Sequence, residues 1–126
     1  MNKVLIVEDH ADIRRLMRMT LEFEDCEIFE ANNGESGLVA AARVLPDVVL
    51  LDVMMPGQFD GLEVGRMLKI TPGLADVKVV ILSARGTAAD LEKGTEAGAH
   101  AYLVKPFSPL ELTRVVRSLA MHGAEA

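Results

Sequence analysis

Short apolar runs alternate with amphipathic stretches along almost the whole chain. The apolar runs lie at residues 4–7, 26–31, 48–51, 77–82 and 101–104. Each run ends in a polar or turn residue, and four of them are nearly continuous in apolar character. Such runs are typical of parallel strands that are covered on both faces of a sheet. The run 26–31 alternates polar and apolar residues instead, which predicts a strand at the edge of the sheet.

Between these runs, apolar residues recur at the spacing of a helix. Clear stripes start at Ile13, Leu38, Val64 and Leu112. The segment 87–97 is weaker, because Leu91 is its only large apolar residue, and we expect a loosely held helix there. Strands that alternate with helices in this way predict an α/β domain with a parallel sheet and helices on both faces.

Composition narrows the class of protein. The chain has 126 residues, of which 50% are hydrophobic and 25% charged, so we expect one folded domain. The net charge of -6 argues against duplex nucleic acid or an anionic membrane as the main partner. No apolar run has the length of a membrane span, no signal-peptide pattern opens the sequence, and the single Cys26 excludes an intrachain disulfide. We therefore expect a cytoplasmic protein.

Polar residues with distinctive chemistry follow the predicted strands. They are Glu8 and Asp9 after the first, Asp52 after the third, Ser83 after the fourth and Lys105 after the fifth. Ligands of open parallel sheets bind beyond the carboxyl ends of the strands, so we expect these side chains on one rim. Two carboxylates at about 4 Å repel by about 4 kcal/mol, so such a rim requires a proton, a lysine or a divalent cation. Carboxylate oxygens suit Mg²⁺, and a carboxylate can also attack phosphorus.

Taken together, these segments resemble the receiver domain of two-component response regulators, including the single-domain chemotaxis type. The resemblance runs from Lys3 to about Leu119. It rests on the segments 4–9, 51–56 with 60–61, 81–84, 94 with 97–99, and 102–107. It implies a flavodoxin-like, doubly wound (βα)5 domain with a five-stranded parallel sheet in the order 2-1-3-4-5. We expect the domain to span residues 1–120, with 121–126 as a flexible tail or the start of a linker.

The resemblance also implies roles for the rim residues. Asp52 would accept a phosphoryl group from a phosphohistidine on a sensor histidine kinase or a phosphotransfer protein. Lys105 would pair with that phosphoryl group, and the Lys105-Pro106 bond would be cis. Mg²⁺ would be the cofactor, and its protein ligands would be Glu8, Asp9, Asp52 and the main-chain carbonyl of Met54.

A conformational switch is implied as well. Ser83 would be the switch hydroxyl, and Tyr102 would turn inward when Ser83 is drawn to the phosphoryl oxygen. The segment 87–97, the fifth strand and the last helix would then signal to a partner protein or to an output domain absent from this chain. The same face could support a dimer that forms on phosphorylation. No direct contact with nucleic acid or membrane is expected of this domain.

Two alternatives remain open from the sequence. The first is a pseudo-receiver that acts through protein contacts without phosphorylation. The second is a phosphatase with an aspartyl nucleophile, which Met54 disfavours because dehalogenase-type phosphatases need a second aspartate there. The leading interpretation is a phosphoacceptor switch without turnover on an external substrate. The link Gly57–Phe59 is one residue longer than is usual in the family, which leaves the local loop shape undetermined.

Two further groups of residues bear on the surface of the domain. Arg14, Arg15 and Arg18 form a basic patch on the first predicted helix, either as its solvated face or as a docking surface for the phosphodonor. The three histidines, His10, His100 and His122, show no ligand spacing and are predicted to be surface residues.

Overall fold

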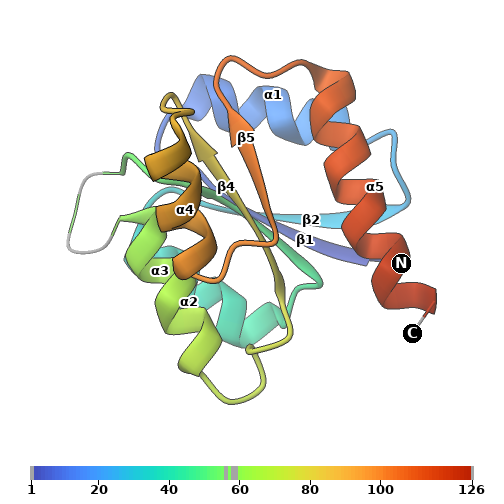
Figure 1. Cartoon of the computed structure of the whole chain (residues 1–126). Helices are drawn as coiled ribbons and strands as arrows, with labels where there is room; N and C mark the ends of the chain where they lie inside the picture. Colours follow the sequence, from blue (N-terminus) through green and yellow to red (C-terminus); the bar gives the residue numbers. More distant parts are fainter. Residues whose placement is uncertain (1, 56, 58–59, 126) are drawn as a thin grey trace.

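Strands and helices alternate strictly along the chain. The computed structural model describes residues 2–55, 57 and 60–125, with side chains up to residue 119. Its elements are β1 (Asn2–Val7), α1 (Ala11–Leu21), β2 (Cys26–Ala31), α2 (Gly34–Val44), β3 (Val48–Asp52), α3 (Gly61–Ile70), β4 (Lys78–Ser83), α4 (Ala88–Glu96), β5 (Ala101–Val104) and α5 (Pro109–Glu125). Figure 1 shows the sheet in the middle, with helices on either side of it.

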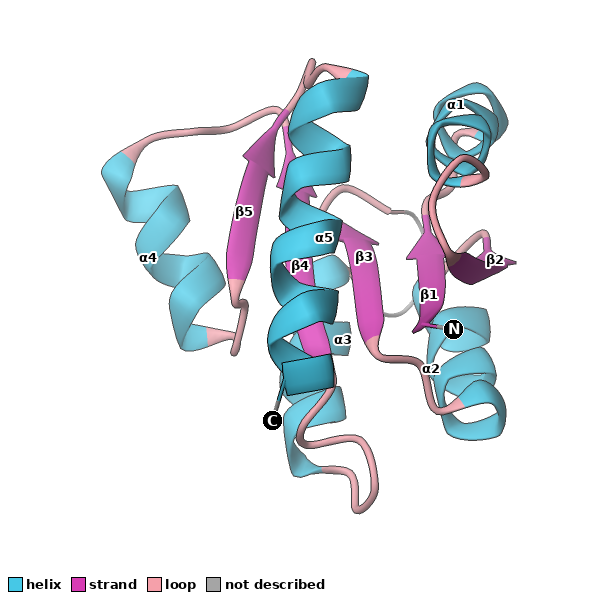
Figure 2. Cartoon of the chain, turned by 90° about the vertical axis from the view of Figure 1, so that its right-hand side faces the viewer, coloured by secondary structure: helices cyan, strands magenta, loops and turns pink. Residues whose placement is uncertain are grey.

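The strands form one parallel sheet in the order β2-β1-β3-β4-β5. Figure 2 shows β2 and β5 at the two edges of this sheet. The predicted α/β class, the strand order and the edge position of the second strand are therefore confirmed. In such a sheet the chain reverses its winding direction between β1 and β3, and ligands bind outside the carboxyl ends of these strands.

The central strands are apolar throughout because alternate side chains enter two different cores. Leu5, Val49 and Ile81 join a core with α2 and α3, whereas Ile6 and Leu50 join one with α1 and α5. Successive strand residues point to opposite faces, so helices on both sides require apolar residues at every position. This packing leaves the strand ends as the places where polar side chains can gather.

Helix α4 is the least anchored of the described helices. Gly94 is its only buried residue, and Leu91 keeps 41% of its surface exposed. The helix begins at a capping box in which Thr87 and Asp90 satisfy each other's backbone donors. The weak apolar stripe predicted for residues 87–97 is thus reflected in the packing.

From Pro109 onward, the described residues of the chain are helical. Helix α5 starts at Pro109 and extends to Glu125, so it includes most of the segment 121–126 expected as a tail. The side chains from residue 120 onward lie outside the described part, and the domain boundary at 120 stays a prediction. Gln58 and Phe59, which lengthen the loop before α3, also lie outside the described residues.

Candidate functional site

Buried polar side chains concentrate at the carboxyl ends of the strands. Glu8 is fully buried, and Asp52 and Ser83 expose 1% and 2% of their surfaces. Within the described part of the chain, these three are the polar or charged residues in the buried class. Burial of a carboxylate costs several kcal/mol unless a partner compensates for it, so this concentration marks a functional site.

Lys105 links the two buried carboxylates across the end of the sheet. Its Nζ lies 2.8 Å from Oε1 of Glu8 and 3.1 Å from Oδ1 of Asp52. The three residues come from the ends of β1, β3 and β5, and the register of the strands places those ends together. The structure thus brings together residues that are up to 97 positions apart in the sequence.

The two carboxylates compete for one ammonium group, and their pKa values move apart. Desolvation by burial, together with the hydrogen bond and the charge of Glu8, raises the pKa of Asp52 to about 7. Burial also opposes the charge on Glu8, but hydrogen bonds from Asp52, Lys105 and the backbone of His10 lower its pKa to about 2. Of the two carboxyl groups, Asp52 therefore binds a proton more readily than Glu8 does.

Two buried oxygens at the site have no hydrogen-bond partner. They are Oδ1 of Asp9 and Oδ2 of Asp52. Ligand atoms from Glu8, Asp9, His10 and Asp52 all lie within 4.8 Å of one another. A cluster of carboxylates in which two oxygens accept no hydrogen bond fits a divalent cation with oxygen ligands, which in proteins is most often Mg²⁺ or Ca²⁺.

Ser83 and Tyr102 are connected through the backbone of one loop residue. The Oγ of Ser83 accepts a hydrogen bond from the N–H of Arg85 at 3.1 Å. The hydroxyl of Tyr102 donates to the carbonyl of the same Arg85 at 2.8 Å. The ring of Tyr102 lies against Gly94 of α4, where a Cβ would approach Cδ2 of the ring to 2.9 Å. The loop after β4 therefore couples the hydroxyl at the site to an aromatic side chain of β5 that packs against α4.

Comparison with known proteins places this chain in a family. The model of the response regulator receiver domain matches residues 4–117. The chain is a response-regulator receiver domain. Its sequence is 42% identical to the transcriptional regulatory protein ResD of Bacillus subtilis over 126 residues, which is 98% of this chain and 50% of that protein. The receiver thus spans about half the length of this transcriptional regulator.

Solved structures agree with the fold of the receiver. The chemotaxis response regulator CheY4 of Vibrio cholerae superimposes with a TM-score of 0.88 at 28% identity, covering 94% of this chain and 98% of that one. The receiver domain of the Francisella response regulator 1452 gives a TM-score of 0.89 at 28% identity, with 98% and 99% covered. Receiver domains are phosphoacceptor signalling modules that work with histidine kinases and downstream targets.

The structure of the receiver locates each residue that the sequence singled out. Glu8, Asp52 and Lys105 are in direct contact, and Asp9 lies beside them. Met54 donates its N–H to Oδ1 of Asp52 at 3.3 Å, while the role of its carbonyl stays a prediction. Ser83 is buried at the end of β4, Tyr102 lies on β5, and the Lys105-Pro106 bond is cis.

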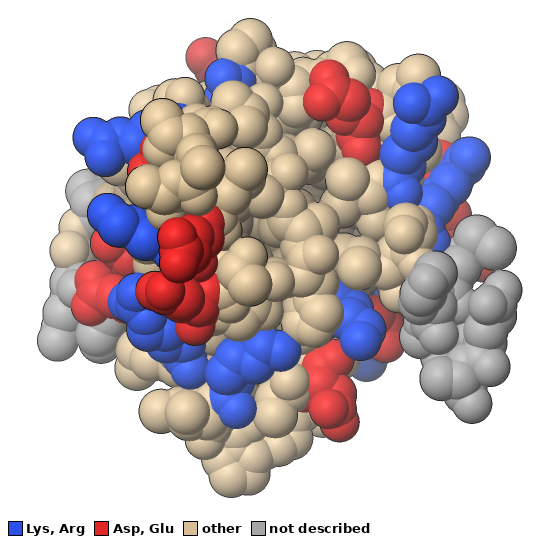
Figure 3. All heavy atoms as spheres, viewed as in Figure 1, with Lys and Arg blue, Asp and Glu red and all other residues tan. Residues whose placement is uncertain are grey.

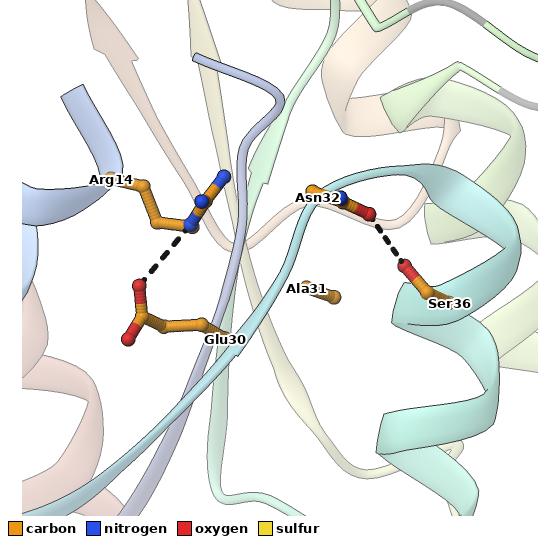
Figure 4. Close-up of a pocket in the computed structure, with 5 residues that line it drawn as sticks. All are labelled: Arg14, Glu30, Ala31, Asn32 and Ser36. Carbon is orange, nitrogen blue, oxygen red and sulfur yellow. Dashed lines mark hydrogen bonds and ion pairs between the residues drawn. The ribbon is translucent and has the colours of Figure 1, made fainter. Parts of the chain in front are cut away.

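The basic patch on α1 is partly neutralised. Arg14 and Arg18 both pair with Glu30 at the end of β2, at 3.2 and 2.6 Å. A cleft of about 420 Å³ lies beside these pairs. Figure 4 shows Arg14 and Glu30 on one side of it, with Asn32 and Ser36 on the other. Arg14 also donates to the carbonyl of Glu8 at 2.8 Å. Two of the three arginines thus hold α1 on the sheet, and use of this patch in docking stays a prediction.

His10 is the site residue that the sequence did not indicate. It is exposed, as predicted, but its Nδ1 lies 3.3 Å from Oε2 of Glu8 and 3.2 Å from Oδ1 of Asp9. No pattern of repeated histidines could have revealed this, because the contact arises from the turn between β1 and α1. The described residues also contain no helix that is both long and apolar enough to cross a membrane.

Proposed function

We propose that this receiver accepts a phosphoryl group on Asp52 and uses it to change the face formed by α4, β5 and α5. The observation that carries the proposal is the buried pair Glu8 and Asp52, held together by Lys105 at a strand end. At this site one carboxylate oxygen of Asp52 has no hydrogen-bond partner, and the positive charge of Lys105 lies next to the same carboxylate. Both are needed when a carboxylate attacks a phosphoryl group.

The transfer follows from the groups present. An oxygen of ionised Asp52 forms a bond to phosphorus, and the bond from phosphorus to the donor breaks, with its electron pair leaving on the donor. As negative charge shifts from the carboxylate to the phosphoryl oxygens, the ammonium of Lys105 can form an ion pair with those oxygens. Mg²⁺, held by Glu8, Asp9, Asp52 and the carbonyl of Met54, would neutralise charge on those oxygens.

The direct test is phosphorylation by acetyl phosphate, followed by mass spectrometry of the intact chain. We expect one added phosphoryl group when Mg²⁺ is present and almost none after chelation. The variant Asp52→Asn is expected to show no adduct. The matched control Asp76→Asn replaces an exposed aspartate and should be phosphorylated like the unaltered chain. An adduct that persists in Asp52→Asn would assign the phosphoryl group to another residue.

A route from the phosphoryl group to the outer face follows from the Ser83–Arg85–Tyr102 connection. A phosphoryl group adds three strong acceptors beside the end of β4. If the hydroxyl of Ser83 turns to donate to one of them, the N–H of Arg85 loses its present acceptor. The loop then shifts, and the carbonyl of Arg85 no longer holds the hydroxyl of Tyr102. Because α4 is weakly anchored, this shift can spread to it at low cost.

The face at the end of this route suits a protein partner. Uncharged residues occupy the middle of the view in Figure 3, and charged residues lie around them. Leu91, Val104 and Leu110 belong to α4, β5 and α5 and are each at least 41% exposed. Exposed apolar side chains on neighbouring elements are a common feature of contact surfaces. We propose a downstream protein, an output domain or a second receiver as the partner of this face.

Tyrosine fluorescence can test the switch, since Tyr102 is the only tyrosine and the chain has no tryptophan. Acetyl phosphate with Mg²⁺ is expected to change the emission of Tyr102. The variant Ser83→Ala should still form the adduct but lose most of this change, because the methyl group cannot donate to the phosphoryl group. Ser83→Thr keeps the hydroxyl and should retain the change. A full response in Ser83→Ala would exclude the hydroxyl as the link.

The two alternatives are less well supported. A pseudo-receiver has no need for a buried carboxylate pair with unsatisfied oxygens, which is costly to maintain. A phosphatase would require a general acid beside Asp52, and the side chain two positions later is the exposed Met54. Donation from a phosphohistidine and action in the cytoplasm belong to the same proposal as the phosphoacceptor role.

A further inference from the structure

The imidazole of His10 is turned toward the carboxylates of the site although nothing in the phosphotransfer chemistry requires it. His10 is the N-cap residue of α1, yet its side chain makes no capping hydrogen bond. Instead its backbone N–H donates to Oε2 of Glu8 at 3.1 Å, and Nδ1 of the ring lies 3.3 Å from the same oxygen. Its side chain is 63% exposed, so the position of the ring is not forced by packing.

A nitrogen atom is thereby added to a set of oxygen ligands. One ligand atom each from Glu8, Asp9, His10 and Asp52 can be chosen so that all four lie within 4.8 Å of one another. An independent observation indicates that a cation belongs there: Oδ2 of Asp52 is buried without a hydrogen-bond partner, on a side chain that is 2% exposed. Oδ1 of Asp9 accepts no hydrogen bond either, and Nδ1 of His10 lies 3.2 Å from it.

The type of ligand atom decides which cations bind well. Mg²⁺ prefers oxygen and binds nitrogen weakly, whereas imidazole nitrogen is a good ligand for Co²⁺, Ni²⁺ and Zn²⁺. We propose that His10 is a nitrogen ligand of the metal site and gives this receiver a preference for such cations over Mg²⁺. The inference rests on the metal site of the proposed function but concerns which cation that site selects.

The test is calorimetric titration of the metal-free chain with Co²⁺ alone and with Mg²⁺ alone, at about pH 8, where an ordinary imidazole is neutral. The variant His10→Gln exchanges the nitrogen ligand for an amide oxygen and removes no helix cap. We expect its Co²⁺ affinity to fall at least ~10-fold and its Mg²⁺ affinity to change less than ~2-fold. The control His100→Gln should bind both metals like the unaltered chain.

Two outcomes would overturn the inference. One is an unchanged Co²⁺ affinity in His10→Gln. The other is an equal loss of affinity for both metals, which would show that His10 only positions the carboxylates. The phosphorylation test is separate from this one. If no adduct forms on Asp52 but Co²⁺ binding depends on His10, the metal preference stands and the phosphoacceptor role fails. If the adduct forms but Co²⁺ binding does not depend on His10, the phosphoacceptor role stands and the metal preference fails.

Discussion

Replacing Asp52 with asparagine is expected to raise the free energy of unfolding at about pH 8 by on the order of 3 kcal/mol. The pKa of Asp52 is raised to about 7 by burial and by Glu8. An ionised Asp52 is therefore less favourable in the folded protein than in the unfolded chain. Asparagine has nearly the same shape, carries no charge, and its amide can donate to Glu8 in place of the proton.

The pH dependence provides the decisive measurement. A raised carboxyl pKa means that the folded state binds the proton more tightly, so stability falls as pH increases from about 4 to about 7. The increase in the free energy of unfolding that Asp52→Asn causes should be small near pH 4 and complete above about pH 7. Glu8 acts in the opposite sense: its pKa is lowered to about 2, so its contribution is present above about pH 4.5 and disappears as pH falls through about 2.

Urea unfolding of both chains across this pH range tests the prediction. The control Asp76→Asn removes an exposed carboxylate and should change stability by less than about 0.5 kcal/mol. If the site binds Mg²⁺ as proposed, millimolar Mg²⁺ should narrow the difference, because a ligand that binds only the folded chain stabilises it. If Asp52→Asn is no more stable than the unaltered chain at any pH, the charge of Asp52 carries no folding cost and the basis of the site's cation requirement is lost.

Replacing Gly61 with alanine is expected to lower the free energy of unfolding by about 3 kcal/mol and to slow phosphorylation. An added Cβ would lie 2.3 Å from the carbonyl oxygen of Asp52 and 2.9 Å from Cα of Val53. Both are backbone atoms, so neither can rotate away as a side chain could. The start of α3 must move away from β3, or the end of β3 must move with Asp52 on it.

A second glycine in the same helix provides the control. At Gly65 the added Cβ would lie 3.2 Å from the carbonyl oxygen of Ala97, which calls for a shift of a few tenths of an ångström. Alanine also favours a helix over glycine by about 1 kcal/mol, which offsets that shift. We expect Gly65→Ala to unfold in urea within about 1 kcal/mol of the unaltered chain and to form the adduct normally. Equal behaviour of the two variants would mean that the contact at Gly61 relaxes without cost.

The sequence predicted the fold well because the relevant pattern is local. The side chains of an uninterrupted apolar run such as 48–51 can all be buried only if both faces of the strand are covered. In the structure, a separate core covers each face. The alternating run 26–31 forms the edge strand β2, and the sparse apolar stripe around Leu91 forms the weakly packed α4. Each of these features depends on neighbouring residues and on the burial of their side chains.

The sequence also predicted which residues meet at the rim, because the carboxyl ends of parallel strands lie together whatever the details of packing. Glu8, Asp52 and Lys105 were expected there, and the structure brings their side chains into contact. Their roles in phosphotransfer, and those of Asp9, Ser83 and Tyr102, stay predictions until the experiments above are performed.

By itself, then, the sequence determined the α/β class, the strand positions and the residues available at the strand ends. Only the tertiary structure decided that burial beside Glu8 raises the pKa of Asp52, that Arg85 links Ser83 to Tyr102, and that Arg14 and Arg18 are held by Glu30. Only it placed His10 against the carboxylates. Hydrophobic periodicity is set by residues a few positions apart. Hydrogen bonding and charge balance depend on distances of a few ångströms between side chains that the fold brings together.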